Sequence, residues 1–443
     1  MKHIDRQILQ IALPSIVSNI TVPLLGLIDV AIVGHLGSPA YIGAIAVGGM
    51  LFNIIYWIFG FLRMGTSGMT SQAYGKRDLP EIVRLLMRSV GIGLAVALCL
   101  ILLQVPIRQT AFLIIHPTAE VREMATLYFH ICIWGAPAML GLYGLSGWFI
   151  GMQNSRIPMY IAITQNIVNI IASLSFVCFF KMKVEGVAFG TLIAQYAGFI
   201  MGLVLWMSRY GKLKKYILWK GVLQKEAMMR FFQVNRDIFL RTLCLVTVTL
   251  FFTSAGASQG EIILAVNTLL MQLFTLFSYV MDGFAYAGEA LSGRYIGARN
   301  RKAFTNTTRH LFIWGGWLAA FFTLVYALGG NAFLGLLTDN KDVVSAAGTY
   351  FYWALAIPVA GIAAFIWDGI FIGATATRGM LASMAIAAIS FFVVYYGLRP
   401  VLGNHALWLA FLVYLAMRGV VMPMLSPKFS KENCWRHGAG FAY

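Results

Sequence analysis

Charge is scarce in this sequence, and acidic charge is the scarcest. Of 443 residues, 11% are charged, and 33 basic residues stand against 16 acidic ones. Soluble globular domains carry about 25% charged residues. Because 60% of the residues are hydrophobic and lie in long runs without polar alternation, the sequence predicts an all-α polytopic membrane protein rather than a barrel.

Motifs of enzymes and of ATP-driven pumps are missing as well. The sequence contains no P-loop, HExxH or GxSxG motif, and its five cysteines have neither metal-site nor redox spacing. We therefore expect no enzymatic activity, no cofactor and no bound metal. Four of the five cysteines lie in apolar runs, and the cysteines are interpreted as packing residues.

The apolar runs number twelve, and each is long enough to cross a bilayer. With the N-terminus in the cytoplasm, 25 of the 33 Lys and Arg residues fall on the cytoplasmic side and six on the other. This bias predicts that both termini are cytoplasmic, and it explains the net charge of +17 without nucleic acid. The predicted spans are 8–34, 40–73, 82–112, 122–151, 157–180, 186–208, 237–257, 261–291, 303–336, 344–373, 379–399 and 404–425.

Two motifs recur at one offset. Gly75–Asp78 (GKRD) recurs as Gly297–Asn300 (GARN), and Phe149–Gly151 (FIG) recurs as Phe371–Gly373, in each case 222 residues later. Six spans per half place both copies in the same orientation, which is typical of lobes that move against each other around a central cavity. We predict an N-terminal six-helix lobe at 1–208, a cytoplasmic linker at 209–235, a C-terminal six-helix lobe at 236–425 and a cytoplasmic tail at 426–443.

The first span carries a single carboxylate, Asp29, about one turn from its far end. Its helix is about 39 Å long at 1.5 Å per residue, and Pro14 and Pro23 each remove a backbone hydrogen bond and permit a bend. An ionisable group inside a membrane indicates a functional site by default, which favours a coupled transporter. The alternative is a structural carboxylate near the headgroups.

The fifth span has one polar face. Asn166, Asn169 and Ser173 lie at i, i+3 and i+7, and buried amides need hydrogen-bond partners such as a carboxylate on another helix. Hydrogen bonding between helices without a site role is the alternative. Gly186 and Gly190 begin the sixth span as a GxxxG pair, which predicts close helix packing.

The second half has more charge inside its spans. Glu289 and Arg294 are predicted to form a structural or gating ion pair with each other or with Arg241. Asp282 and Asp368 have no cation nearby in the sequence. We expect both to line the internal cavity, Asp368 being the stronger site candidate.

Three stretches, LPSIVSNITVPLLGLIDVAIVGHLG, FLRMGTSGMTSQAYG and DGFAYAGEALSGRYIGAR, resemble the multidrug and toxic compound extrusion (MATE) transporters, and in particular their DinF branch. The resemblance covers essentially the whole chain. It implies two six-helix lobes, a bacterial inner-membrane location, and efflux of organic cations in exchange for H⁺ or Na⁺.

By the same resemblance, Asp29 matches the family's first-helix carboxylate and Pro14 its bending proline. Ser173 stands where many members have a second carboxylate, and Ser146 where an asparagine is often found. The missing carboxylate favours H⁺ over Na⁺ as the coupling ion. The polar network implied around Asp29 consists of Tyr128, Ser146, Asn169, Ser173 and Thr191.

The sequence thus predicts a drug/proton antiporter that acts as a monomer on small cationic or amphipathic substrates. A Na⁺-coupled antiporter and a flippase for a lipid-linked substrate are the alternatives. A flippase would need a strongly cationic cavity for phosphate. A membrane-embedded enzyme lacks converging catalytic groups, and a pore has no need for two repeated lobes.

Overall fold

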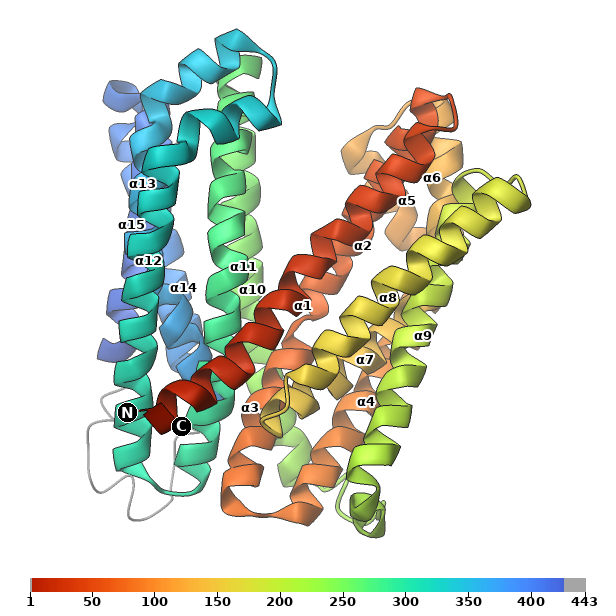
Figure 1. Ribbon diagram of the computed structural model, residues 1–443, viewed down its shortest axis with the longest axis vertical. Helices are drawn as coiled ribbons and strands as arrows, with labels where there is room; N and C mark the ends of the chain where they lie inside the picture. The colour runs from red at the N-terminus through yellow and green to blue at the C-terminus, as the bar shows by residue number, and fades with distance from the viewer. Residues whose placement is uncertain (1, 426–443) are drawn as a thin grey trace. The chain divides into compact units, whose positions relative to one another are not determined.

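A computed structural model describes residues 2–425, and these residues are helical apart from short connections (Figure 1). Twelve helical segments within this range are long and apolar enough to cross a membrane, so the predicted all-α fold with twelve spans is confirmed. The predicted tail at 426–443 lies outside the described residues.

The chain forms two compact units. The first-half unit runs from Val17 to Phe232, and the second-half unit combines the chain up to Ile16 with the chain from Gln233 on. The first-half unit contains α2 (Pro39–Phe59), α3 (Phe61–Lys76), α4 (Leu79–Leu102), α5 (Gln104–Ile115), α6 (Ala119–Cys132), α7 (Ala136–Gly151), α8 (Arg156–Leu174) and α9 (Val184–Tyr210). The second-half unit contains α11 (Glu261–Gly297), α12 (Arg301–Leu337), α13 (Lys341–Gly373), α14 (Thr377–Leu402) and α15 (Asn404–Met424).

Two helices belong partly to each unit. Helix α1 (Lys2–Gly34) leaves the second-half unit after Ile16, two residues beyond Pro14, and continues unbroken through Pro23. Helix α10 (Lys225–Ala257) leaves the first-half unit after Phe232. Each unit therefore contains the first turns of a helix that continues in the other.

Several spans differ in detail from the predicted runs. A 3₁₀ turn follows α9 at Gly211–Tyr216, and α10 already begins at Lys225, so only part of the hydrophilic stretch 209–235 is irregular. The run 82–112 is divided at Leu103 between α4 and α5. A 3₁₀ turn separates α6 from α7 just before Pro137, a position where the missing proline N–H costs no intrahelical hydrogen bond.

The 222-residue repeat is present in the backbone of each half. Arg77 and Arg299 are both left-handed, with φ of 59° and 55°. The residues after them, Asp78 and Asn300, both cap the next helix by accepting a backbone N–H three residues on. The repeated sequence therefore encodes the same helix–turn–helix geometry twice.

The two halves also share a very close helix crossing at repeated positions. In the first half, a Cβ added to Gly147 of α7 would collide with the backbone of Arg63 in α3. In the second half, a Cβ added to Gly369 of α13 would collide with the backbone of Ala285 in α11. Both the glycines and their partners are 222 residues apart, and Gly151 and Gly373 repeat the arrangement one turn later. Small residues bring these backbones together as in other membrane helix pairs.

Candidate functional site

Asp29 is buried within the first-half unit, with 5% of its surface exposed. The Thr191 hydroxyl of α9 donates a hydrogen bond to Asp29 Oδ2 at 3.2 Å. The second carboxylate oxygen, Oδ1, is buried without a hydrogen-bond partner among the described residues. A buried charge is costly without full compensation, and here hydrogen bonding satisfies one of the two carboxylate oxygens of Asp29.

The hydrogen bonds continue from Thr191 into α8. Asn169 Nδ2 donates to Thr191 Oγ1 at 3.5 Å, and Ser173 Oγ donates to Asn169 Oδ1 at 2.8 Å. Asn169 and Ser173 are fully buried, and Thr191 is 7% exposed. The predicted polar face of α8 therefore meets a carboxylate through Thr191, and its amide is held in one orientation by Ser173.

A glycine allows α8 and α9 to approach closely enough for this chain of bonds. A Cβ added to Gly190 would lie 2.8 Å from the backbone nitrogen of Ser173, nearer than side chains normally come. Gly190 precedes Thr191, so the close approach sets the position of the hydroxyl that Asp29 accepts from. The predicted close packing at the glycine pair of α9 is confirmed at Gly190.

The second-half unit holds a different charge cluster. Asp368 of α13 is 5% exposed, and its Oδ2 accepts hydrogen bonds from Arg241 of α10 and Arg418 of α15. Asp368 has no cation nearby in the sequence, and its two cations come from positions 127 and 50 residues away. Arg418, which the sequence reasoning did not single out, also lies over the Tyr414 ring at 5.5 Å. Asp368 is thus a compensated charge, unlike Asp29.

Comparison with known proteins identifies the family to which this chain belongs. The MatE family model matches residues 14–174 and 238–399. DNA damage-inducible protein F of Escherichia coli (strain K12) is 38% identical over 442 residues, covering 99% of this chain and 94% of that protein. The chain belongs to the MATE family. It is therefore a multi-pass membrane transporter and not an enzyme.

Solved MATE structures have the same fold. The Vibrio cholerae MATE transporter VcmN in its bent form gives a TM-score of 0.86 at 17% identity, covering 98% of this chain and 99% of that one. A second MATE crystal structure in the bent conformation gives 0.85 at 18% identity, covering 97% of both chains. At these identities the likeness concerns the fold alone.

The MATE resemblance also implied Tyr128 and Ser146 near Asp29. Tyr128 of α6 is 5% exposed and packs edge-on against Phe52, and its ring occupies the space left by Gly48. Ser146 of α7 is half-buried and makes none of the cluster's hydrogen bonds among the described residues. The roles of both side chains in coupling stay predictions.

The remaining charged residues predicted for this MATE protein lie on α11. Glu289 is 1% exposed and Asp282 is half-buried. Arg241, the alternative predicted partner of Glu289, is paired with Asp368. A gating pair of Glu289 with Arg294, and a site role for Asp282, stay predictions.

Proposed function

We propose that this protein is a proton-coupled antiporter that expels organic cations or other amphipathic small molecules, with Asp29 as the coupling carboxylate. The observation that carries the proposal is a buried carboxylate bound on one oxygen by Thr191 and contacted by no Lys or Arg among the described residues. Such a carboxylate can bind a proton or a cationic substrate without first breaking an ion pair.

The hydrogen-bond pattern supports a two-state mechanism. Ionised Asp29 only accepts hydrogen bonds, as it does from Thr191, whereas protonated Asp29 gains an O–H that must find an acceptor. Protonation therefore rearranges the contacts of α1 with α9. Because α1 passes into the second-half unit beside Pro14, we propose that this proline is the hinge where the rearrangement alters the helix.

The same pattern favours H⁺ over Na⁺. A sodium ion needs several oxygen ligands, but the Asn169 oxygen already accepts from Ser173 and its nitrogen points at Thr191. The Thr191 hydroxyl, directed toward the carboxylate, thus acts as a donor there rather than as an oxygen ligand. For the orientation, the excess of Lys and Arg on one side supports placing both termini in the bacterial cytoplasm, with the protein in the inner membrane.

The test is transport in proteoliposomes under a proton gradient or a sodium gradient applied separately, with ethidium as the probe cation. Asp29→Asn keeps the shape but cannot titrate, so we expect normal insertion and stability with loss of proton-driven efflux. Asp29→Glu should recover part of the efflux. Asp342→Asn, the same change at an exposed carboxylate at the start of α13, is the matched control and should behave as wild type.

Full proton-driven efflux by Asp29→Asn, measured per correctly inserted molecule, would refute the proposal. Efflux driven by sodium alone would replace H⁺ by Na⁺ as the coupling ion. Poor stability of Asp29→Asn with intact coupling in the surviving protein would make Asp29 a structural residue. Absence of ethidium transport with movement of a lipid-linked substrate would favour a flippase.

A further inference from the structure

The connection between α9 and α10 combines exposed cations with exposed apolar side chains. We call residues 209–223 (RYGKLKKYILWKGVL) the basic connector; they include no acidic residue. Trp219 is 77% exposed, Leu223 75% and Leu218 58%. Five basic side chains accompany them, all exposed: Arg209, Lys212, Lys214, Lys215 and Lys220.

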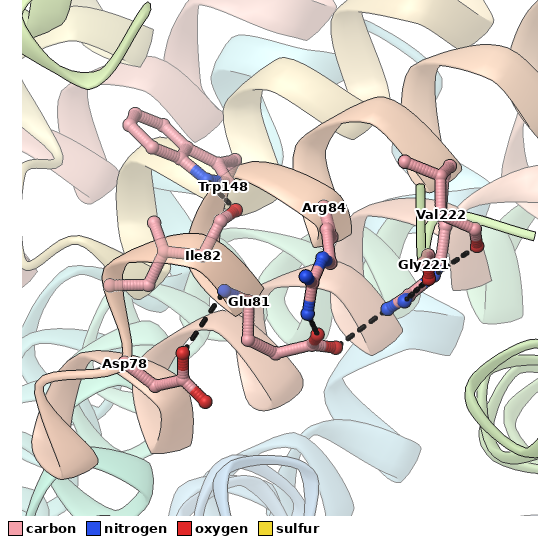
Figure 2. A network of polar contacts seen from close by, with 8 residues as sticks. Asp78, Glu81, Ile82, Arg84, Trp148, Gly221 and Val222 are labelled. Carbon is pink, nitrogen blue, oxygen red and sulfur yellow. Dashed lines mark hydrogen bonds and ion pairs between the residues drawn. The ribbon is translucent and has the colours of Figure 1, made fainter. Parts of the chain in front are cut away.

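The basic connector is fixed to the first-half unit rather than loosely tethered. Arg88 of α4, 3% exposed, donates from Nε to the carbonyl of Val222 at 2.7 Å and from Nη2 to that of Gly221 at 2.9 Å. Its Nη1 pairs with Glu81 at 2.6 Å, which in turn lies near Arg84 (Figure 2). A buried arginine with every nitrogen engaged holds the connector in one place.

The end of the connector is also shaped for this contact. Gly221 has φ of 91°, a conformation that other residues rarely adopt, and a Cβ there would lie 3.1 Å from the Arg84 guanidinium. Val222 beside it is buried at 3% exposure, while Trp219 and Leu223 on either side stay outside. The apolar side chains that could have turned inward are therefore presented outward by a defined backbone.

A surface that exposes tryptophan and leucine beside lysines, and that has no acidic residue, suits the interface between a bilayer and water. The basic connector overlaps the end of the candidate membrane span Val184–Tyr216 and continues beyond it, so we expect it to lie where a bilayer surface meets water. There, tryptophan and leucine enter the headgroup region, and lysines contact lipid phosphates. We propose that the basic connector is a binding surface for the anionic lipids of the bilayer in which the protein lies.

The test measures hydrogen–deuterium exchange of the connector in the full-length protein. The protein is placed in nanodiscs of phosphatidylcholine with or without phosphatidylglycerol. Anionic lipid should slow exchange of the peptide 211–224 by about tenfold, because basic residues near an anionic surface are attracted to it and the bound lipid shields the backbone amides. Replacing Lys212, Lys214 and Lys215 together by Gln should remove most of this slowing.

A charge-matched control is available on other connections. Lys181, Lys183 and Lys341 are exposed, and replacing all three by Gln should leave the slowing intact. Trp219→Ala should speed exchange of the peptide 211–224 in both lipids, since the indole contributes apolar contact that does not depend on lipid charge. The inference is overturned if both lipids give equal exchange, if both triple variants behave alike, or if inorganic phosphate added to phosphatidylcholine nanodiscs reproduces the slowing. None of these measurements depends on transport or on Asp29.

Discussion

Replacing Gly190 by Ala tests whether the close approach of α8 and α9 organises the Asp29 cluster. The new Cβ would collide with the Ser173 hydroxyl oxygen and would lie 2.8 Å from the Ser173 nitrogen and 2.9 Å from its Cα, whereas real Cβ contacts are essentially never under 3.0 Å and ordinary ones begin at 3.4 Å. The helices must therefore separate by at least 0.2 Å, and reaching an ordinary contact takes 0.6 Å. The bond from Asn169 to Thr191 is already 3.5 Å long, so this separation breaks it.

The expected cost follows from overpacking a tight interface, about 1–3 kcal/mol. Alanine also has a higher helix propensity than glycine, by about 1 kcal/mol. Gly91→Ala in α4, where a Cβ meets nothing within 4 Å, measures that gain alone. We therefore expect Gly190→Ala to be about 1–3 kcal/mol less stable than Gly91→Ala.

The assay is unfolding by SDS in mixed micelles, paired with proton-driven efflux from proteoliposomes. Gly91→Ala should keep wild-type efflux, whereas Gly190→Ala should lose most of it even at temperatures where it remains folded. If Gly190→Ala matches Gly91→Ala in both stability and efflux, the hydrogen-bond chain from Ser173 to Asp29 does not depend on this helix contact, and our reasoning fails.

Two further predictions separate the roles of the other polar residues. Asp368→Asn should destabilise the protein by about 3–5 kcal/mol in SDS unfolding, because it leaves two buried guanidinium groups uncompensated. Replacing Asp368, Arg241 and Arg418 together by Leu should restore much of that loss, and a stable Asp368→Asn protein would contradict the ion-pair interpretation. Ser173→Ala should reduce proton-driven efflux by freeing the Asn169 amide, whereas Ser146→Ala should have little effect; the reverse order would favour the family-implied network over the observed one.

Local patterns in the sequence predicted most of the architecture. The twelve apolar runs identify spans because hydrophobic length is a property of one segment. The GKRD and GARN motifs predicted the repeat because a left-handed residue followed by a capping Asp or Asn is itself local. The glycines of GWFIG and GIFIG lie where helices cross very closely in each half. Their spacing is visible in the sequence as a pair of small residues, but these crossings were not predicted from it.

Contacts between segments that are far apart in the sequence were harder to predict. The polar face of α8 was visible in the sequence, but its link to Asp29 came only from the family resemblance, since Thr191 is 162 residues away. The Asp368 cluster was missed for a second reason. The seventh span was predicted to begin at 237, which placed Arg241 at a helix end, whereas α10 begins at Lys225 and carries Arg241 well inside.

The division of α1 between the units has a consequence for biosynthesis. Asp5 accepts hydrogen bonds from His310 and Trp314, and Gln7 accepts one from the Tyr295 hydroxyl, so the first turns pair with residues synthesised much later. Tyr295 follows Gln7 by 288 positions, which takes a ribosome on the order of 14–58 s at about 5–20 residues per second. During that interval Asp5 and Gln7 lack these hydrogen-bond donors. Substitutions at His310 or Tyr295 should therefore impair membrane integration of the first helix, although they lie in the other half of the gene.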